Sequence, residues 1–195
     1  MKTALNKFLA FFVIVLAFNM EACTHNKVQQ EAEVVKQLPY FELTDQDGNA
    51  FTNASVKNKY IISAFFFTGC PSICPKMTTQ MKRVAAAIGK DEKFLILYHS
   101  IDPEGDTQQQ LNFYALKNNL PASWKLLRGD TGNIYRLANY YLVRAGRDKN
   151  DAAGFIHSGS FVLTDQNGVP NKYYNGLDST SVQELIHQIQ NLKKI

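Results

Sequence analysis

Two cysteines four residues apart, Cys70 and Cys74, are the residues of this chain best suited to chemistry. They lie in a segment, residues 65–77, that predicts the end of a buried strand, a tight turn and the start of a helix. Residues one helical turn apart share a face of the helix. The rise of one turn is about 5.4 Å, and a Cα–Cα distance of that size permits a disulfide. The helix N-terminus also favours thiolates, which hold soft metal ions.

A purely structural role for the pair stays open at this point. A disulfide or two buried thiols would explain the spacing without any function. A bridge between Cys70 and Cys74 would close a very short loop, however, and would constrain little of the unfolded chain.

The flanking pattern explains how the thiols are positioned. Residues 60–67 are an apolar run interrupted only by Ser63, which favours a strand covered on both faces. Gly69 and Pro71 end that run, and Pro75 suits the first turn of a helix. The helix should run to about Ile88, where Gly89 stops it, with a buried stripe of Met77, Met81, Val84, Ala85 and Ile88.

The rest of the chain alternates strands and helices, which predicts an α/β fold with a mixed central sheet, an N-terminal hairpin extension and flanking helices. Capping boxes are expected to open two helices, at Asp106 with Gln109 and at Ser181 with Glu184, and Asp130 is expected to cap a third. Residues 144–154 read as a long loop serving a site. Predicted strands are 40–43, 50–52, 94–98, 124–127, 160–163 and 172–174.

Residues 1–23 have the pattern of a targeting segment. Lys2 and Lys7 precede an apolar run, residues 8–18, that is too short to span a bilayer, and Cys23 follows. This order resembles the bacterial lipoprotein signal, in which the cysteine becomes the acylated N-terminus; an ordinary secretory peptide or an uncleaved anchor is the alternative. Residues 24–37 then read as a polar tether and residues 38–195 as the domain, which we expect on the periplasmic side of the bacterial cell membrane.

Composition limits the function classes. The chain has 195 residues, 45% of them hydrophobic, and a formal net charge of only +4. Its basic residues are scattered, so nothing indicates a nucleic-acid partner. With Cys23 lipidated, Cys70 and Cys74 are the remaining pair, which excludes a zinc site of four cysteines.

Three features together resemble the Sco/SenC family of copper-binding, thioredoxin-like proteins associated with cytochrome c oxidase assembly. They are the Cys70-x-x-x-Cys74-Pro75 motif, a loop with Asp102-Pro103-x-x-Asp106-Thr107, and the distant His157-Ser158. The resemblance covers roughly residues 38–192 and implies a thioredoxin-like fold.

The resemblance also implies that Cys70, Cys74 and His157 bind copper. Thiolates suit Cu(I) and imidazole suits Cu(II), so this set can keep copper through a change of oxidation state. It implies as partner the copper-bearing subunit of cytochrome c oxidase, with the membrane reached through the lipid anchor. One departure is Ile156, where many members have an Asp before the His.

The other residues that could bind a metal ion are expected to have structural or surface roles instead. His25 belongs to the tether, His187 to a solvent-exposed helix stripe, and His99 ends a strand near the Asp-Pro loop without matching the family pattern. Met77 and Met81 have core-facing spacing. Asp102 and Asp106 either tune the site electrostatically or shape the loop.

Three functions compete. The first is a metallochaperone that helps assemble the dinuclear copper (CuA) centre of the oxidase. The second is an extracytoplasmic thiol-disulfide reductase that keeps the oxidase cysteines reduced: Cys70 attacks a disulfide between them, one of their thiolates leaves, and Cys74 resolves the mixed disulfide. The third is a copper or redox sensor.

Overall fold

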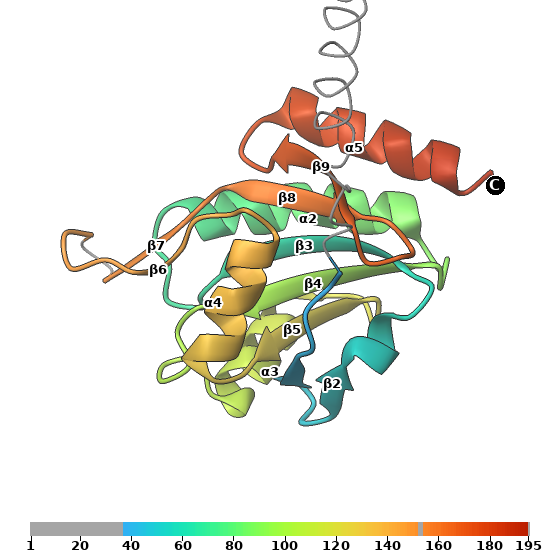
Figure 1. The fold of residues 1–195 in the computed structure, drawn as a ribbon. Helices are drawn as coiled ribbons and strands as arrows, with labels where there is room; N and C mark the ends of the chain where they lie inside the picture. Colours follow the sequence, from blue (N-terminus) through green and yellow to red (C-terminus); the bar gives the residue numbers. More distant parts are fainter. Residues whose placement is uncertain (1–36, 152–153, 195) are drawn as a thin grey trace, which may run out of the picture. The chain divides into compact units, whose positions relative to one another are not determined.

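The computed structural model describes residues 37–151 and 154–194, which form a seven-stranded sheet with helices on both faces (Figure 1). The predictions for the targeting segment, Cys23, His25 and most of the tether fall outside the described residues. None of the helices in the described part of the chain has the length and apolarity needed to cross a bilayer. The elements are β1 (Glu42–Asp45), β2 (Ala50–Thr52), the 3-10 helix η1 (Asn53–Val56), β3 (Tyr60–Phe66), α2 (Ile73–Ile88), β4 (Phe94–Ser100), α3 (Gln108–Asn118), β5 (Trp124–Arg128), α4 (Thr131–Tyr140), β6 (Ala145–Arg147), β7 (Phe155–His157), β8 (Ser160–Thr164), β9 (Pro170–Asn175) and α5 (Ser179–Leu192).

The sheet is mixed, as the alternating pattern predicted. Its strand order is β2-β1-β5-β4-β3-β8-β9. The central pairings of β4 with β3 and β5 are parallel, and the outer ones are antiparallel. Every residue of β3 from Ile61 to Phe66 is buried, which is why that strand reads as a continuous apolar run. Because β3, β4 and β5 are parallel, the turns after them meet at one edge of the sheet.

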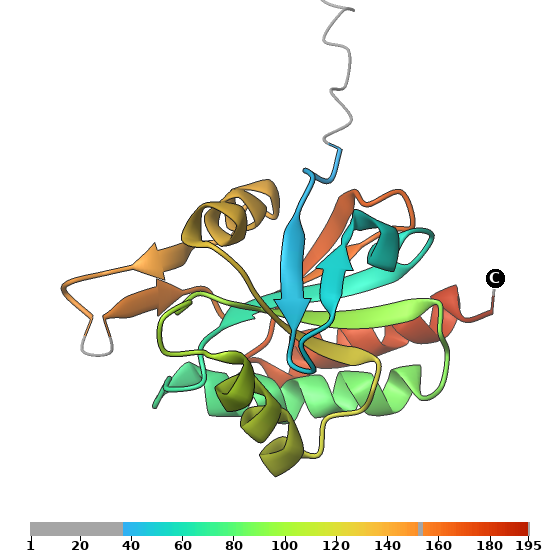
Figure 2. The same cartoon turned by 90° about the horizontal axis from the view of Figure 1, so that it is seen from below.

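The helices cover both faces of the sheet. Figure 2 shows α4 on one face and α2, α3 and α5 on the other. The predicted stripe of α2 is buried, and Gly89 ends the helix with φ of +64°. The helix is therefore fixed on the sheet, and its N-terminus is held beside the edge where β3 ends.

Two of the three predicted helix caps are wrong. Thr107, not Asp106, caps α3, and its hydroxyl accepts a hydrogen bond from the Gln110 N–H. Asp178, not Ser181, caps α5. Asp130 caps α4 as expected. Neighbouring residues with a similar preference for the N-cap position compete at the start of each of these helices. At α3, the tertiary contacts of Asp106 leave the cap to Thr107.

The predicted loop over residues 144–154 is also wrong in part. β6 and β7 pair antiparallel, with Ala145 opposite His157 and Arg147 opposite Phe155. This two-stranded hairpin extends from the body of the domain beyond α4 (Figure 1). His157 therefore lies at the end of a strand of its own rather than in a loop.

Candidate metal centre

The structure brings together the three side chains that the sequence singled out. The Sγ atoms of Cys70 and Cys74 and a ring nitrogen of His157 all lie within 4.8 Å of one another, and all three residues are buried. Two donors on one metal ion, at about 2.0–2.3 Å each, can stand up to about 4.6 Å apart. The three donors can therefore share one ion after a small contraction, and two sulfurs with one imidazole suit a soft or borderline transition metal.

The thiol pair is positioned by the junction between β3 and α2. The strand ends at Phe66, and the Cys70 N–H donates to the Phe67 carbonyl at 3.2 Å, which closes the turn. The helix begins at Ile73, so Cys74 lies in its first turn and Pro75 takes a position where no intrahelical N–H partner is needed. Cys70 and Cys74 are free thiols in this structure.

His157 comes to the thiols from the other side. Its Nε2 lies 3.1 Å from Cys74 Sγ, and its Nδ1 lies 3.3 Å from the Ser158 carbonyl oxygen. That carbonyl can only accept, which favours the tautomer protonated at Nδ1 and leaves the Nε2 lone pair facing the sulfurs. The Phe67 ring meets the imidazole edge to face at 5.9 Å and limits its rotation.

The pKa values of the two thiols are shifted in opposite directions. The pKa of Cys70 falls to about 3, chiefly because Cys74 hydrogen-bonds to its sulfur, with further help from His157 and backbone N–H groups at the start of α2. The pKa of Cys74 is raised, first by the hydrogen bond to Cys70 and then by burial. The pair therefore holds one proton between two sulfurs, which a bound metal ion would replace.

Asp106 braces the turn that carries the thiols. Its buried carboxylate accepts hydrogen bonds from the Thr68 N–H at 3.1 Å, the Thr68 hydroxyl at 2.5 Å and the Ser100 hydroxyl at 2.5 Å. Asp102 accepts the Gly105 N–H at 3.0 Å and so shapes its own loop. Sequence reasoning named both acids but missed Thr68 and Ser100, which nothing in their local pattern marks as partners.

The remaining candidates have other surroundings. His99 is fully buried, stacks on Phe65 at 4.9 Å and contacts Tyr141, on the face of the sheet covered by α4. Met77 and Met81 are fully buried in the core, and His187 is exposed. Neither His99 nor His187 joins the group of three donors found among the described residues.

Two cavities open onto the thiols. One of about 320 Å³ lies toward α3 and is lined by Thr68, Cys70, Cys74 and Tyr114 among others. A smaller one of about 160 Å³ lies toward the β6–β7 hairpin and reaches Cys70 and His157. The donors are therefore enclosed but still reachable from two sides.

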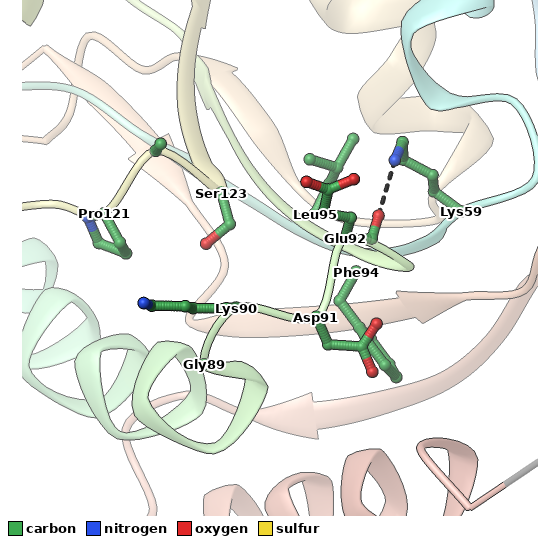
Figure 3. Close-up of a pocket in the computed structure, with 10 residues that line it drawn as sticks. Lys59, Gly89, Lys90, Asp91, Glu92, Phe94, Leu95, Pro121 and Ser123 are labelled. Atoms are coloured by element: carbon green, nitrogen blue, oxygen red, sulfur yellow. Dashed lines mark hydrogen bonds between the residues drawn. The ribbon is translucent and has the colours of Figure 1, made fainter.

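A larger hollow of about 510 Å³ lies at the far end of α2, around residues 89–95 (Figure 3). Lys59 Nζ donates to the Glu92 carbonyl at its rim. Its lining contains no cysteine or histidine. It therefore offers neither of the donor types that form the candidate metal centre.

The comparisons with known proteins agree with one another. A family model described as SCO1/SenC matches residues 29–194. The chain is 30% identical to a SCO1/SenC family lipoprotein from Bacillus anthracis, whose crystal structure superposes with a TM-score of 0.72 over 82% of this chain and 96% of that one.

Two further solved structures are similar at 28% identity. One is ScoI of Bradyrhizobium japonicum with copper bound, at a TM-score of 0.64 over 77% of this chain and 98% of that one. The other is BsSco, described as a Sco family cytochrome c oxidase assembly protein with a disulfide switch, at a TM-score of 0.69 over 82% and 94%. These neighbours confirm the predicted fold class.

Proposed function

Because this chain belongs to the SCO1/SenC family, we propose that it is a copper metallochaperone that binds copper through Cys70, Cys74 and His157 and helps assemble the CuA centre of cytochrome c oxidase. The observation that carries the proposal is the convergence of two sulfurs and one imidazole nitrogen within 4.8 Å. The copper bound by the ScoI neighbour and the oxidase assembly role given for BsSco support it.

The arrangement fits a carrier better than a permanent cofactor site. Two thiolates hold Cu(I), and the imidazole makes Cu(II) acceptable as well. Three protein donors are one fewer than the four of a closed structural metal site, which would make release of the ion easier. The cavities beside Cys70 would allow donors of a second protein to approach the cargo and displace these ligands one at a time.

A transfer assay tests this function. Copper-loaded chain is mixed, without oxygen, with the apo form of the soluble copper-bearing domain of the oxidase, and the absorption of the CuA centre is followed. We expect transfer from the wild-type chain and none from the Cys70→Ser variant, which should not retain copper. A wild-type chain that keeps its copper in the presence of this acceptor would contradict the proposal.

A thiol-disulfide reductase is the second candidate, and the acidity of Cys70 favours it. A thiolate with a pKa lowered to about 3 is present at neutral pH, and Cys70 is the more exposed of the two thiols, at 8% against 2% for Cys74. In this role His157 carries no metal. A His157→Ala variant that still reduces an oxidised acceptor at the wild-type rate, with no copper present, would favour the reductase.

We also propose that the chain is tethered to the outer side of the bacterial cell membrane through acylated Cys23. The support is the order of Lys2, Lys7, the apolar run and the cysteine, together with the lipoprotein nature of the Bacillus anthracis neighbour. Metabolic labelling with a radioactive fatty acid should mark the wild-type chain and leave the Cys23→Ser variant unlabelled. Equal labelling of both would contradict the anchor.

A further inference from the structure

We propose that Asp106 is a positioning residue of the metal centre, whose buried negative charge favours Cu(II) over Cu(I) and whose hydrogen bonds to Thr68 fix the place of Cys70. The proposal rests on the copper-binding function proposed above. It concerns a residue that is not itself one of the three donors.

The first step is proximity. Both carboxylate oxygens of Asp106 accept the Thr68 N–H, at 3.1 and 3.2 Å, and Oδ1 also accepts the Thr68 hydroxyl. Thr68 precedes Cys70 by two residues, which is two Cα steps of about 3.8 Å each. Thr68 also lines the cavity that reaches both thiols. The carboxylate is thus tied directly to the segment that places the sulfurs.

The second step is the charge state of Asp106. Ser100 Oγ accepts the Asp102 N–H at 3.2 Å, so its own hydrogen is free to be donated to Asp106 Oδ2. With Thr68, this gives the carboxylate several donors and suits the ionised form. Burial raises the pKa of Asp106, and these hydrogen bonds oppose that rise. Thr68, which holds this carboxylate, lines the same cavity as Cys70 and Cys74, so the charge lies close to the two sulfurs.

The third step is the charge of the loaded site. Two thiolates and a neutral imidazole carry a net charge of −1 with Cu(I) and 0 with Cu(II). A fixed negative charge close by therefore destabilises the Cu(I) form relative to the Cu(II) form. The position before His157 supplies no negative charge, because it is occupied by the apolar Ile156. Among the described residues the buried carboxylates are Asp45 and Asp106, and Asp45 is held by Lys125 at 3.1 Å instead.

The test compares two variants of the full chain with the wild type. Asp106→Asn removes the charge and keeps the shape, whereas Ser100→Ala removes one hydrogen bond and keeps the charge. Retention of Cu(I) and of Cu(II) is measured by competition with a chelator for each ion, and the midpoint potential of the copper is measured alongside. Thermal melting without metal reports whether each variant is folded.

For Asp106→Asn we expect the preference for Cu(II) over Cu(I) to fall about tenfold, which is a rise of about 59 mV in a one-electron potential. For Ser100→Ala we expect a change of less than about twofold. An unchanged ratio in folded Asp106→Asn would overturn the proposal, and so would an equal change in both variants. If Asp106→Asn does not fold, Asp106→Ser, which leaves room for water at the same donors, is measured in its place.

These measurements distinguish a failure of the copper-binding function from a failure of the role of Asp106. A wild-type chain that retains neither ion overturns the copper function and the role of Asp106 together. A wild-type chain that retains copper, with a ratio that Asp106→Asn does not alter, overturns the role of Asp106 alone.

Discussion

Cys74 Sγ lies 3.1 Å from His157 Nε2, although 83 positions separate the two residues in the chain. One residue belongs to the first turn of α2 and the other to the end of β7. The fold thus brings two thiols and an imidazole nitrogen, from segments that are far apart in the sequence, to one candidate metal centre. The predictions below test what each part of that site contributes.

Loss of the imidazole should affect the two copper ions unequally. In His157→Ala two thiolates remain, which suffices for a soft ion but not for Cu(II), which prefers nitrogen. We expect the affinity for Cu(II) to fall more than about 100-fold and that for Cu(I) by about tenfold. Chelator competition for each ion measures this, and equal losses for both ions would show that the imidazole does not discriminate between them.

Cys70 should react as a thiolate throughout the neutral range. An ordinary thiol gains about tenfold in thiolate per pH unit below its pKa. Since the pKa of Cys70 falls to about 3, its alkylation by iodoacetamide in the metal-free, reduced chain should be nearly constant between pH 5 and 8. Mass spectrometry of the modified peptide follows the rate. A rate that rises tenfold per unit over this range would contradict the shared-proton pair.

Buried His99 should make the fold sensitive to acid. Burial lowers its pKa to about 3, so between pH 6.5 and 3 the unfolded chain binds a proton that the folded chain does not, and stability falls as the pH falls. From pH 6.5 to 5 this costs about 2 kcal/mol. Tyr141, which packs on the ring, has a pKa raised to about 12 by burial and does not titrate in this range.

Urea unfolding of the metal-free chain at the two pH values measures the effect of His99. In His99→Phe the loss of stability between pH 6.5 and 5 should shrink by about 2 kcal/mol. The matched control, His187→Asn, changes an exposed imidazole on α5 and should leave the loss as it is in the wild type. A His99→Phe variant with the wild-type pH dependence would assign the acid sensitivity to other groups.

The thioethers of α2 should contribute packing and no copper ligand. Met77 and Met81 are fully buried in the hydrophobic core, on the core-facing stripe of α2. Exchange for leucine conserves volume, so Met77→Leu and Met81→Leu should each change the free energy of unfolding by less than about 1.5 kcal/mol. Copper retention should equal that of the wild type; a loss of copper in either folded variant would place a thioether in the site.

The junction of β3 and α2 could be predicted from sequence because its signals are local. The buried run before Gly69, Pro75 in the first helical turn and the stripe ending at Gly89 each act within a few residues. The fold class followed from the alternation of such elements.

The role of His157 could not be predicted in the same way. The segments around it are short and carry glycine and charged residues, so they lack the alternation that marks a hairpin; β6 and β7 exist because they pair with each other. From the residues alone, His157 could equally have been a core histidine, and the family resemblance was needed to single it out. The sequence also predicted Asp106 as a helix cap, whereas its carboxylate bonds to Thr68 and Ser100. These two partners become neighbours only when β3 and β4 align, so no local pattern could reveal them.

Copper stoichiometry is the most direct test of the three-donor site. The reduced chain is loaded with Cu(I) without oxygen and titrated with a chromogenic Cu(I) chelator, and Cys70→Ser, Cys74→Ser and His157→Ala are treated in parallel. We predict one firmly held copper per wild-type chain, lost in both cysteine variants and held more weakly in His157→Ala. A wild-type chain that retains no copper, with Cys70 and Cys74 active only in disulfide exchange, would contradict the account.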